Sequence, residues 1–231
     1  MIKRLVIFGC AHLGSKSARI EHLEKYVKLL EEPDTYGLIL GDMFENAIPS
    51  RGEGMMWDQS TTPQEQLDDA DRLLRPFKHK IVGACGSNHS VRSWKEIGID
   101  IDRELYCRLG IPKIYKGEEG IIMFEGKKIA FAHGNGSGDN WKDALKLYTI
   151  YPDADIICVS HRHKMTMDWH GSFHLDRAGR RHEKFTLFVR TGGLMDWARY
   201  AKRELYAPQK PGFSIIYFPK GEPPRVDCNG I

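Results

Sequence analysis

Histidine, asparagine, aspartate and cysteine recur where five apolar runs of the sequence end. The runs are KRLVIF, YGLIL, KIVGA, IAFA and IICV, and a short polar segment follows each at once or after one residue. These segments are Gly9-Cys10-Ala11-His12, Gly41-Asp42, Gly86-Ser87-Asn88-His89, His133-Gly134 and Ser160-His161-Arg162-His163. Imidazole, carboxylate and thiolate groups are ligands for borderline divalent metals. Any one segment would pass for a turn or a structural histidine, but five in succession favour one metal site.

The elements that must hold these residues alternate between strand and helix. The five apolar runs predict buried strands, and helical spacing of apolar residues predicts helices between them. Two strands around Glu125-Gly126 predict a hairpin, and strands are also expected near Ile114 and late in the chain. Helices are expected at 17–31, 64–75, 98–109 and 141–148, late strands at 185–190 and 213–218, a long loop at 44–63, and a helical or irregular segment at 195–206. The pattern predicts an α/β fold of layers around two sheets in one domain, 1–231, with ligands bound beyond the carboxyl ends of strands.

Composition excludes several classes of protein. The chain has 231 residues, 41% of them hydrophobic, which is too many for a disordered chain and enough for a core that needs no metal to fold. Its apolar runs are too short to cross a membrane, and no basic-then-apolar leader opens it, so we expect a cytoplasmic protein with no membrane contact. The formal net charge of +3 permits a phosphate-bearing ligand without indicating a dedicated nucleic-acid binder.

The order of the five segments resembles the motifs of the calcineurin-like metallophosphoesterase superfamily, in its compact phage and bacterial form. The family pattern is Asp-x-His, Gly-Asp, Gly-Asn-His, His and Gly-His-x-His, and the matching positions run from Cys10 to His163. The resemblance implies a four-layer αββα sandwich with two divalent metal ions, manganese, zinc, iron or nickel, at the strand ends.

The same resemblance implies a role for each matched residue. His12 and His163 would ligate the first metal, and Asp42 would bridge both. The second metal would be held by Asn88, His133 and His161. His89 would be catalytic, orienting the phosphate and stabilising or protonating the leaving oxygen. A hydroxide made from metal-bound water would attack the phosphorus atom in line.

Cys10 is the main departure from the family pattern, because an aspartate usually stands there. As a thiolate, Cys10 would also ligate the first metal and favour zinc or iron. Alternatively it is a small buried residue beside an impaired site. Three further residues are candidates for binding substrate: Asn46 in the long loop, Asn135 after His133, and Arg162 between two ligands. For each, a purely structural role is an equal or better explanation.

The sequence therefore predicts a metal-dependent phosphoesterase, a hydrolase acting on phosphate esters. The first hypothesis is a phosphodiesterase or nuclease that cleaves a nucleic-acid or nucleotide phosphate, with no obligate protein partner. The alternatives are a small-molecule phosphatase, a cyclic-nucleotide phosphodiesterase, and a catalytically impaired binding module, the last suggested by Cys10.

Overall fold

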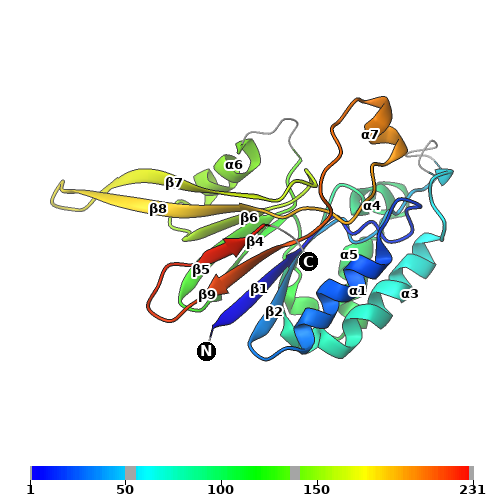
Figure 1. Cartoon of the computed structure of the whole chain (residues 1–231), viewed down its shortest axis with the longest axis horizontal. Helices are drawn as coiled ribbons and strands as arrows, with labels where there is room; N and C mark the ends of the chain where they lie inside the picture. The colour runs from blue at the N-terminus through cyan, green and yellow to red at the C-terminus, as the bar shows by residue number, and fades with distance from the viewer. Residues whose placement is uncertain (1, 50–55, 136–140, 229–231) are drawn as a thin grey trace.

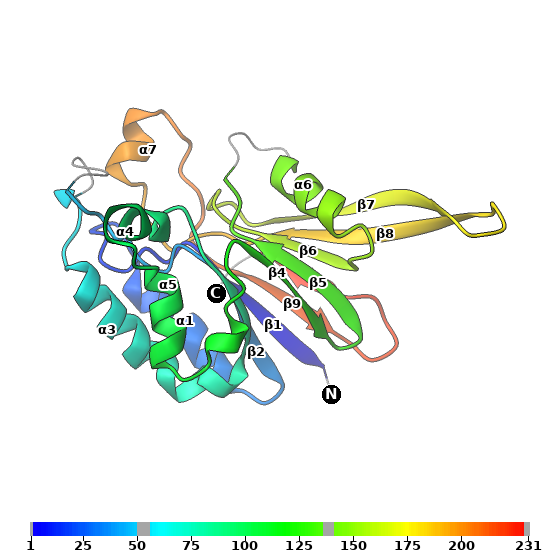
Figure 2. The same ribbon diagram turned by 180° about the vertical axis from the view of Figure 1, so that it is seen from behind.

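The computed structural model describes residues 2–49, 56–135 and 141–228. Two five-stranded sheets lie face to face in it, and helices cover their outer faces (Figure 1). Figure 2 shows the same layers from behind, with one helix, α6, on the second sheet and the other long helices on the first.

The first sheet has the strand order β10-β9-β1-β2-β3. Strand β1 lies at its centre, parallel to β2 and antiparallel to β9. Because β1, β2 and β3 are parallel, their carboxyl ends meet at one edge of the sheet. The strands are β1 (Lys3–Phe8), β2 (Thr35–Leu40), β3 (Ile81–Cys85), β9 (Ser214–Phe218) and β10 (Arg225–Asp227).

The second sheet has the order β4-β5-β6-β8-β7. Strands β5, β6 and β8 are parallel, whereas β4 and β7 are antiparallel to their neighbours. The strands are β4 (Glu119–Phe124), β5 (Lys127–Ala132), β6 (Ile156–Val159), β7 (Thr166–Leu175) and β8 (Arg181–Arg190). Their parallel members end at the same side of the molecule as those of the first sheet, so the polar segments converge there (Figure 1).

Local sequence explains where several helices begin and end. The side chain of Thr62 accepts a hydrogen bond from the Glu65 amide and Glu65 returns one, a capping box that starts α3 with Pro63 in its first turn. Gly98, at φ 72°, ends α4. The helices are α1 (Ile20–Lys28), α3 (Pro63–Leu74), α4 (Ser90–Ile97), α5 (Ile101–Arg108), α6 (Lys142–Ile150) and α7 (Arg199–Arg203), with 3₁₀ turns η1 (Leu29–Glu31), η2 (Arg75–Lys80) and η3 (Pro112–Ile114).

Three clusters of buried apolar side chains separate the layers. Leu5 and Leu38 of the first sheet pack against Phe131 and Val189 of the second, forming the core between the sheets. Helices α1, α3 and α5 pack on the other face of the first sheet, and α6 packs on the other face of the second. The predicted α/β class and the four-layer αββα sandwich are therefore confirmed.

The structure corrects several sequence-based boundaries. The segment near Ile114 is a 3₁₀ turn that makes only an isolated bridge, Ala84 with Tyr115, and not a strand. Helix α4 and strand β7 were not predicted, and β8 begins four residues before the expected 185. Part of the predicted loop, 50–55, lies outside the described residues. In the described ranges, no helix combines the length and apolar character needed to cross a membrane.

Candidate metal centre

The loops that follow β1 and β2 run side by side. The amide of Cys10 donates to the Gly41 carbonyl at 3.1 Å, and that of His12 donates to the Asp42 carbonyl at 3.0 Å. The amide of Leu13 continues the series to Met43 at 2.8 Å. This parallel ladder extends the β1–β2 pairing beyond the strands, so it sets where the side chains of Cys10, His12 and Asp42 lie relative to one another.

Five of the predicted ligands have left-handed backbone conformations. Non-glycine residues rarely adopt positive φ, and the strain persists only where the surrounding structure imposes it, as at functional sites. The residues and their φ angles are Cys10 (52°), His12 (50°), Asp42 (47°), His161 (73°) and His163 (54°). The fold therefore holds this set in an otherwise unfavourable conformation.

Two glycines let the ligand loops approach closely. A Cβ atom at Gly9 would lie 2.3 Å from Oγ of Ser160, so a side chain there would push the loops after β1 and β6 apart. Gly41 has φ 73°, and a Cβ atom on it would lie 2.7 Å from the Gly86 carbonyl oxygen. The loops after β2 and β3 can therefore meet only because residue 41 is glycine.

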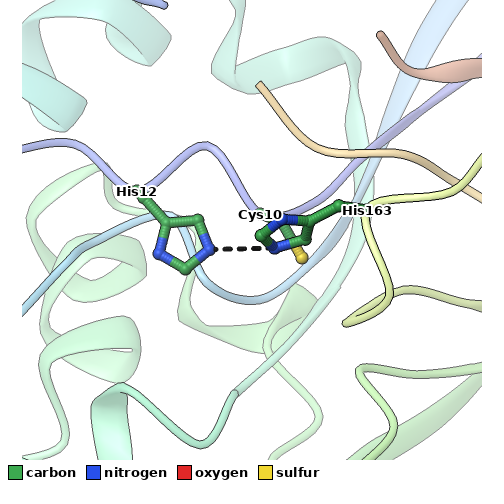
Figure 3. A group of neighbouring side chains, drawn as sticks. All are labelled: Cys10, His12 and His163. Atoms are coloured by element: carbon green, nitrogen blue, oxygen red, sulfur yellow. Dashed lines mark hydrogen bonds between the residues drawn. The ribbon is translucent and has the colours of Figure 1, made fainter. Parts of the chain in front are cut away.

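His12, His163 and Cys10 form one group of candidate ligands (Figure 3). Nε2 of His12 lies 3.3 Å from Nε2 of His163. The other ring nitrogen of His12, Nδ1, lies 3.1 Å from Oε2 of Glu45. A proton on Nδ1 donated to this carboxylate leaves the Nε2 lone pair directed at His163, which is how outer carboxylates orient metal-binding histidines.

Asp42, His133 and His161 form a second group. Nε2 of His133 lies 3.1 Å from Oδ2 of Asp42 and 3.1 Å from Nδ1 of His161. Nδ1 of His133 donates to the Leu40 carbonyl at 2.6 Å. Burial lowers the pKa of His133, but Asp42 and the Leu40 carbonyl raise it overall, so Nε2 becomes a lone pair only where a cation replaces its proton. Asp42 also lies 3.8 Å from Nε2 of His12, so its carboxylate stands between the two groups. That position is the one expected for a bridging ligand.

The electrostatics of these groups fit divalent cations. Burial lowers the pKa of His161 to about 4 and that of His163 to about 3, so both imidazoles are neutral at pH 7. Burial opposes ionisation of Asp42, but His133, His89 and His12 together hold its pKa well below its usual value. The site thus presents a carboxylate and several imidazole lone pairs facing one another, a donor set for borderline metals.

Cys10 lies between the two groups. Its Sγ is within 4.8 Å of the ligand atoms of His12 and His163, and likewise of those of Asp42 and His133. Sγ also lies 3.1 Å from Oγ of Ser160. Burial, and then the charge of Asp42, raises the pKa of the thiol far above its usual value. Only a bound cation would make Cys10 a thiolate here, so its ligation stays a prediction.

His89 lies beside these groups on the loop that enters α4. Its Nε2 is 4.0 Å from Oδ2 of Asp42, and its backbone amide is 3.4 Å from Oδ1 of the same carboxylate. Nδ1 of His89 donates to the Glu45 carbonyl at 2.8 Å. The structure therefore brings His89 to the edge of the candidate centre with its proton on the nitrogen that points away from Asp42.

No family model and no curated protein matches the sequence, whereas many solved structures match the fold. A structure reported as a novel archaeal phosphodiesterase matches with a TM-score of 0.52 and 11% identity, covering 97% of this chain and 98% of that one. The chain has the calcineurin-like metallophosphoesterase fold. Two further structures are similar. A metallophosphoesterase from Sphaerobacter thermophilus has a TM-score of 0.46 and 15% identity, covering 94% of this chain and 84% of that one. Vps29 from Chaetomium thermophilum has a TM-score of 0.49 and 13% identity, covering 97% of this chain and 94% of that one.

Within this metallophosphoesterase fold, Glu45 is a site residue that the sequence analysis missed. Its carboxylate contacts His12, as described, and lies 3.7 Å from Nη1 of Arg92. Burial opposes ionisation, but the hydrogen bond from His12 and nearby charges lower the pKa of Glu45 overall. The sequence did contain a signal for this residue, because Glu45 is an acid only three positions after Asp42. It lies in a segment that was interpreted only as a loop.

The remaining predicted residues lie in different surroundings. Asn88 is exposed and lines the cavity above the ligands. Asn46 is fully buried behind His89: its amide donates to the His89 carbonyl at 2.8 Å and to Oγ of Ser93 at 3.1 Å. Asn46 is not among the described residues that line the cavity, so its evident role is to hold the His89 loop. Arg162 and Asn135 line an adjoining hollow that also borders His161 and His163.

A cavity of about 690 Å³ opens above the candidate ligands. Asp42, His12 and His163 are among the residues at its base. Its other lining residues include basic and apolar side chains from the loop after β2, from α4 and from the segment around α7, together with the acids Glu45 and Asp58 and the serines Ser15 and Ser17. They include Trp57, Arg92, Met195, Ala198, Arg199 and Arg203.

Proposed function

We propose that this protein is a metal-dependent phosphoesterase, and specifically a phosphodiesterase acting on a nucleic-acid or nucleotide phosphate. One observation carries the proposal: two pairs of facing imidazole nitrogens, His12 with His163 and His133 with His161, flank the Asp42 carboxylate at the base of an arginine-lined cavity. Lone pairs so placed accept divalent cations, and the guanidinium groups accept a phosphate.

Different residues of the chain would bind the cations, orient the ligands and face the leaving oxygen. Asp42, His133, His161 and Asn88 would hold one cation, and His12 and His163 the other, together with Cys10 if its thiol ionises. Bound cations would supply Lewis acidity, activating water and neutralising charge on the phosphate oxygens. Glu45 orients His12 through the 3.1 Å contact, and the Leu40 carbonyl orients His133. His89 would face the leaving oxygen from the edge of the site.

The walls of the cavity support a substrate with more than one phosphate or with a base. Arg199 and Arg203 are exposed on α7 and line the cavity together with Trp57, whose side chain is 79% exposed. Arginine pairs with backbone phosphates, and an exposed indole offers a face on which a base can stack. Single-stranded nucleic acid, or a nucleotide with an attached group, has both features.

The direct test is hydrolysis of bis-p-nitrophenyl phosphate with manganese, zinc or nickel added. We expect metal-dependent turnover by the wild-type protein and none by Asp42→Ala, because the carboxylate between the two ligand groups is lost. Asp68→Ala is a matched control, since Asp68 is an exposed acid paired with Arg108 and lines neither this cavity nor the adjoining hollow. Turnover by Asp42→Ala near the wild-type rate would contradict the assignment.

Substrate class is tested with short single-stranded oligonucleotides and with cyclic nucleotides. We expect Trp57→Ala and Arg203→Ala to weaken oligonucleotide binding and its salt dependence while sparing bis-p-nitrophenyl phosphate. Trp94→Ala is the control for Trp57, because Trp94 is 59% exposed and is not a lining residue of this cavity. If cyclic nucleotides or phosphate monoesters are cleaved instead and the two variants change nothing, the small-molecule alternative is favoured.

A catalytically impaired binding module is the second candidate, and the buried Cys10 thiol is the observation that favours it. Loss of the usual carboxylate, with the pKa of the thiol raised by burial, weakens one half of the centre. Turnover separates the two hypotheses, whatever the metal content. Protein that binds two metals, one metal or none and turns over no phosphate ester with any metal would be a binding module.

A further inference from the structure

Strands β7 and β8 form a ribbon that extends far beyond the rest of the second sheet (Figures 1 and 2). The two strands pair along their whole length, from Thr166 with Arg190 to Leu175 with Arg181. Strand β7 is the edge of the sheet, since its outer side has no paired strand among the described residues. In this ribbon β7 is a ten-residue edge strand, and its outer side faces solvent.

One face of this ribbon is largely apolar along β7, although Arg181 and Glu183 of β8 share it and the Arg181 guanidinium lies 4.3 Å from the centre of the Phe173 ring. Side chains of β7 alternate between faces, so Met167, Trp169, Phe173 and Leu175 share a face with Phe185 of β8, which pairs with Gly171. Near the base of the ribbon the same face is the core between the sheets, where Leu187 and Val189 are fully buried. Farther out, Phe173 is 59% exposed, Phe185 60% and Leu175 74%. Along β7 the apolar pattern thus continues beyond the sheet that could cover it, whereas β8 contributes Glu183 and Arg181 there.

The backbone groups on the free edge of β7 can be assigned. The amide of Trp169 donates to Oδ1 of Asp168 at 2.8 Å and not to β8. Pairs in an antiparallel ladder alternate between bonded and unbonded, so the N–H and C=O groups of residues 167, 169, 171, 173 and 175 point outward. Natural edge strands are usually protected by lysine, proline or a bulge. Strand β7, TMDWHGSFHL, has neither lysine nor proline, and its register with β8 is unbroken.

We propose that β7 pairs antiparallel with β7 of a second copy of this chain, about a two-fold axis at Gly171. The pairing joins the second sheets of the two molecules into one continuous sheet. It is isologous, so each contact occurs twice. In this register residues 167, 169, 171, 173 and 175 of one copy form backbone hydrogen bonds with the same set of residues in the other copy. These are the residues whose N–H and C=O groups point outward from the free edge.

The sequence of β7 is self-complementary in this register. Trp169 lies opposite Phe173 of the second copy, and Met167 lies opposite Leu175, so both apolar pairs share the uncovered face. On the other face Asp168 lies opposite His174. At the axis Gly171 meets its own copy, where a side chain would crowd the ring of Phe185, 3.3 Å from the position of a Cβ atom.

Neighbouring registers that keep the bonding pattern lose this match. Centring the pair on residue 170 sets Trp169 against Gly171 and Asp168 against Ser172. Centring it on residue 172 sets Asp168 against Asp176, a repulsion between like charges. Charge and shape therefore select the register about Gly171 over these two. A second copy is the occupant, because the complementarity lies within one strand.

The first test measures mass in solution over a concentration series by sedimentation velocity. We expect the wild-type protein to dimerise and Phe173→Lys to be monomeric, because a lysine opposite Trp169 breaks the apolar pair on both sides of the axis. Trp94→Lys is the matched control, since it places the same charge at an equally exposed aromatic residue on the body and should leave the dimer intact. A wild-type monomer at every concentration, or a dimer that Phe173→Lys leaves unchanged, would overturn the proposal.

A charge exchange tests the register itself. Asp168→Lys alone and His174→Asp alone should each weaken the dimer, and the double variant should restore it, because the pair then has reversed signs. Circular dichroism and thermal unfolding show that each variant is folded. Failure of the double variant to recover the dimer, with both single variants impaired, would rule out the contact between 168 and 174.

Cross-linking gives an independent readout. With the exposed Cys107 changed to serine and Phe185 to alanine to make room for the new side chain, Gly171→Cys should form an intermolecular disulfide on mild oxidation. Bonded residues of an antiparallel pair have Cα atoms about 5.5 Å apart, within disulfide range. Ser172→Cys lies on the opposite face and faces residue 170 of the second copy, so it should not cross-link. Equal cross-linking of both variants would indicate random collision. This proposal does not depend on the proposed enzymatic function, since a dimer can form whether or not the site is active.

Discussion

Arg92 donates a hydrogen bond to the catalytic candidate His89: Nη2 of Arg92 lies 3.1 Å from Nε2 of His89. The other ring nitrogen of His89 donates to the Glu45 carbonyl at 2.8 Å, so Nε2 must be the acceptor. Burial lowers the pKa of His89 to about 4, in agreement with a neutral ring. At neutral pH the positive charge next to His89 is therefore that of Arg92, and His89 presents a lone pair held by that guanidinium.

Arg92→Ala should lower kcat roughly 10²-fold, the usual effect of removing one positioned charged donor. Metal content should stay at the wild-type level, because Arg92 is not a candidate ligand. Arg92→Lys should recover only part of the rate, since an ammonium group cannot bond to His89 and to the Glu45 carbonyl, 2.7 Å away, in the same geometry. Arg72→Ala, an exposed arginine on α3, is the control. An unchanged kcat in Arg92→Ala would show that Arg92 does not contribute to turnover.

His89→Ala should keep the metal content and lower turnover by roughly 10²–10⁴-fold, the range for a general acid or base. To serve as the acid, His89 must first take a proton on Nε2 in the substrate complex, because that nitrogen accepts from Arg92 in the free protein. The loss should be larger for esters with a more basic leaving group, because those depend most on help for the departing oxygen. Metal analysis and a series of substituted phenyl phosphodiesters measure both effects. If the metal content falls together with the rate, His89 is a ligand and its assigned role is wrong.

Cys10→Asp should shift the metal preference from zinc or iron toward manganese while activity is retained. The physical reason is that sulfur is a softer ligand than a carboxylate oxygen. In the wild-type protein loaded with zinc, X-ray absorption should show a metal–sulfur bond of about 2.3 Å. Cys10→Ser is the matched control for size. An absorption spectrum without sulfur, together with an unchanged preference in Cys10→Asp, would leave Cys10 a buried bystander.

Asp102 should make folding stability fall as the pH rises. It is 1% exposed at the start of α5, and its Oδ2 has no hydrogen-bond partner among the described residues. Burial raises its pKa from 3.8 to about 7. Between these two values the unfolded chain has released the proton and the folded chain keeps it, so raising the pH favours unfolding.

The size of this effect follows from the shift of about three pKa units, which corresponds to at most roughly 4 kcal/mol of unfolding free energy lost by pH 8. Asp102→Asn should remove that loss, because an amide does not titrate. Denaturant unfolding of both proteins at several pH values between 4 and 8 measures the difference. If the unfolding free energies of the two proteins change with pH in parallel across this range, Asp102 ionises normally in the folded state.

Much of the fold and the candidate ligands could be predicted from the sequence, because buried parallel strands show as continuous apolar runs. The residues after Phe8, Leu40, Ala132 and Val159 had to converge once those runs became neighbouring strands. Strand β7 was missed although Met167, Trp169, Phe173 and Leu175 alternate with polar residues, because it contains no continuous apolar run of the kind that revealed the buried strands.

The sequence by itself determined which residue types stand at the strand ends, and so the kind of chemistry available to this protein. Only the tertiary structure decided how they act, because ring orientation, tautomer and ionisation depend on neighbours far away in the chain. Arg92 fixes the proton of His89, Glu45 orients His12, and burial keeps Cys10 a thiol until a cation binds. None of these contacts follows from spacing, since each depends on where two separate loops meet in space.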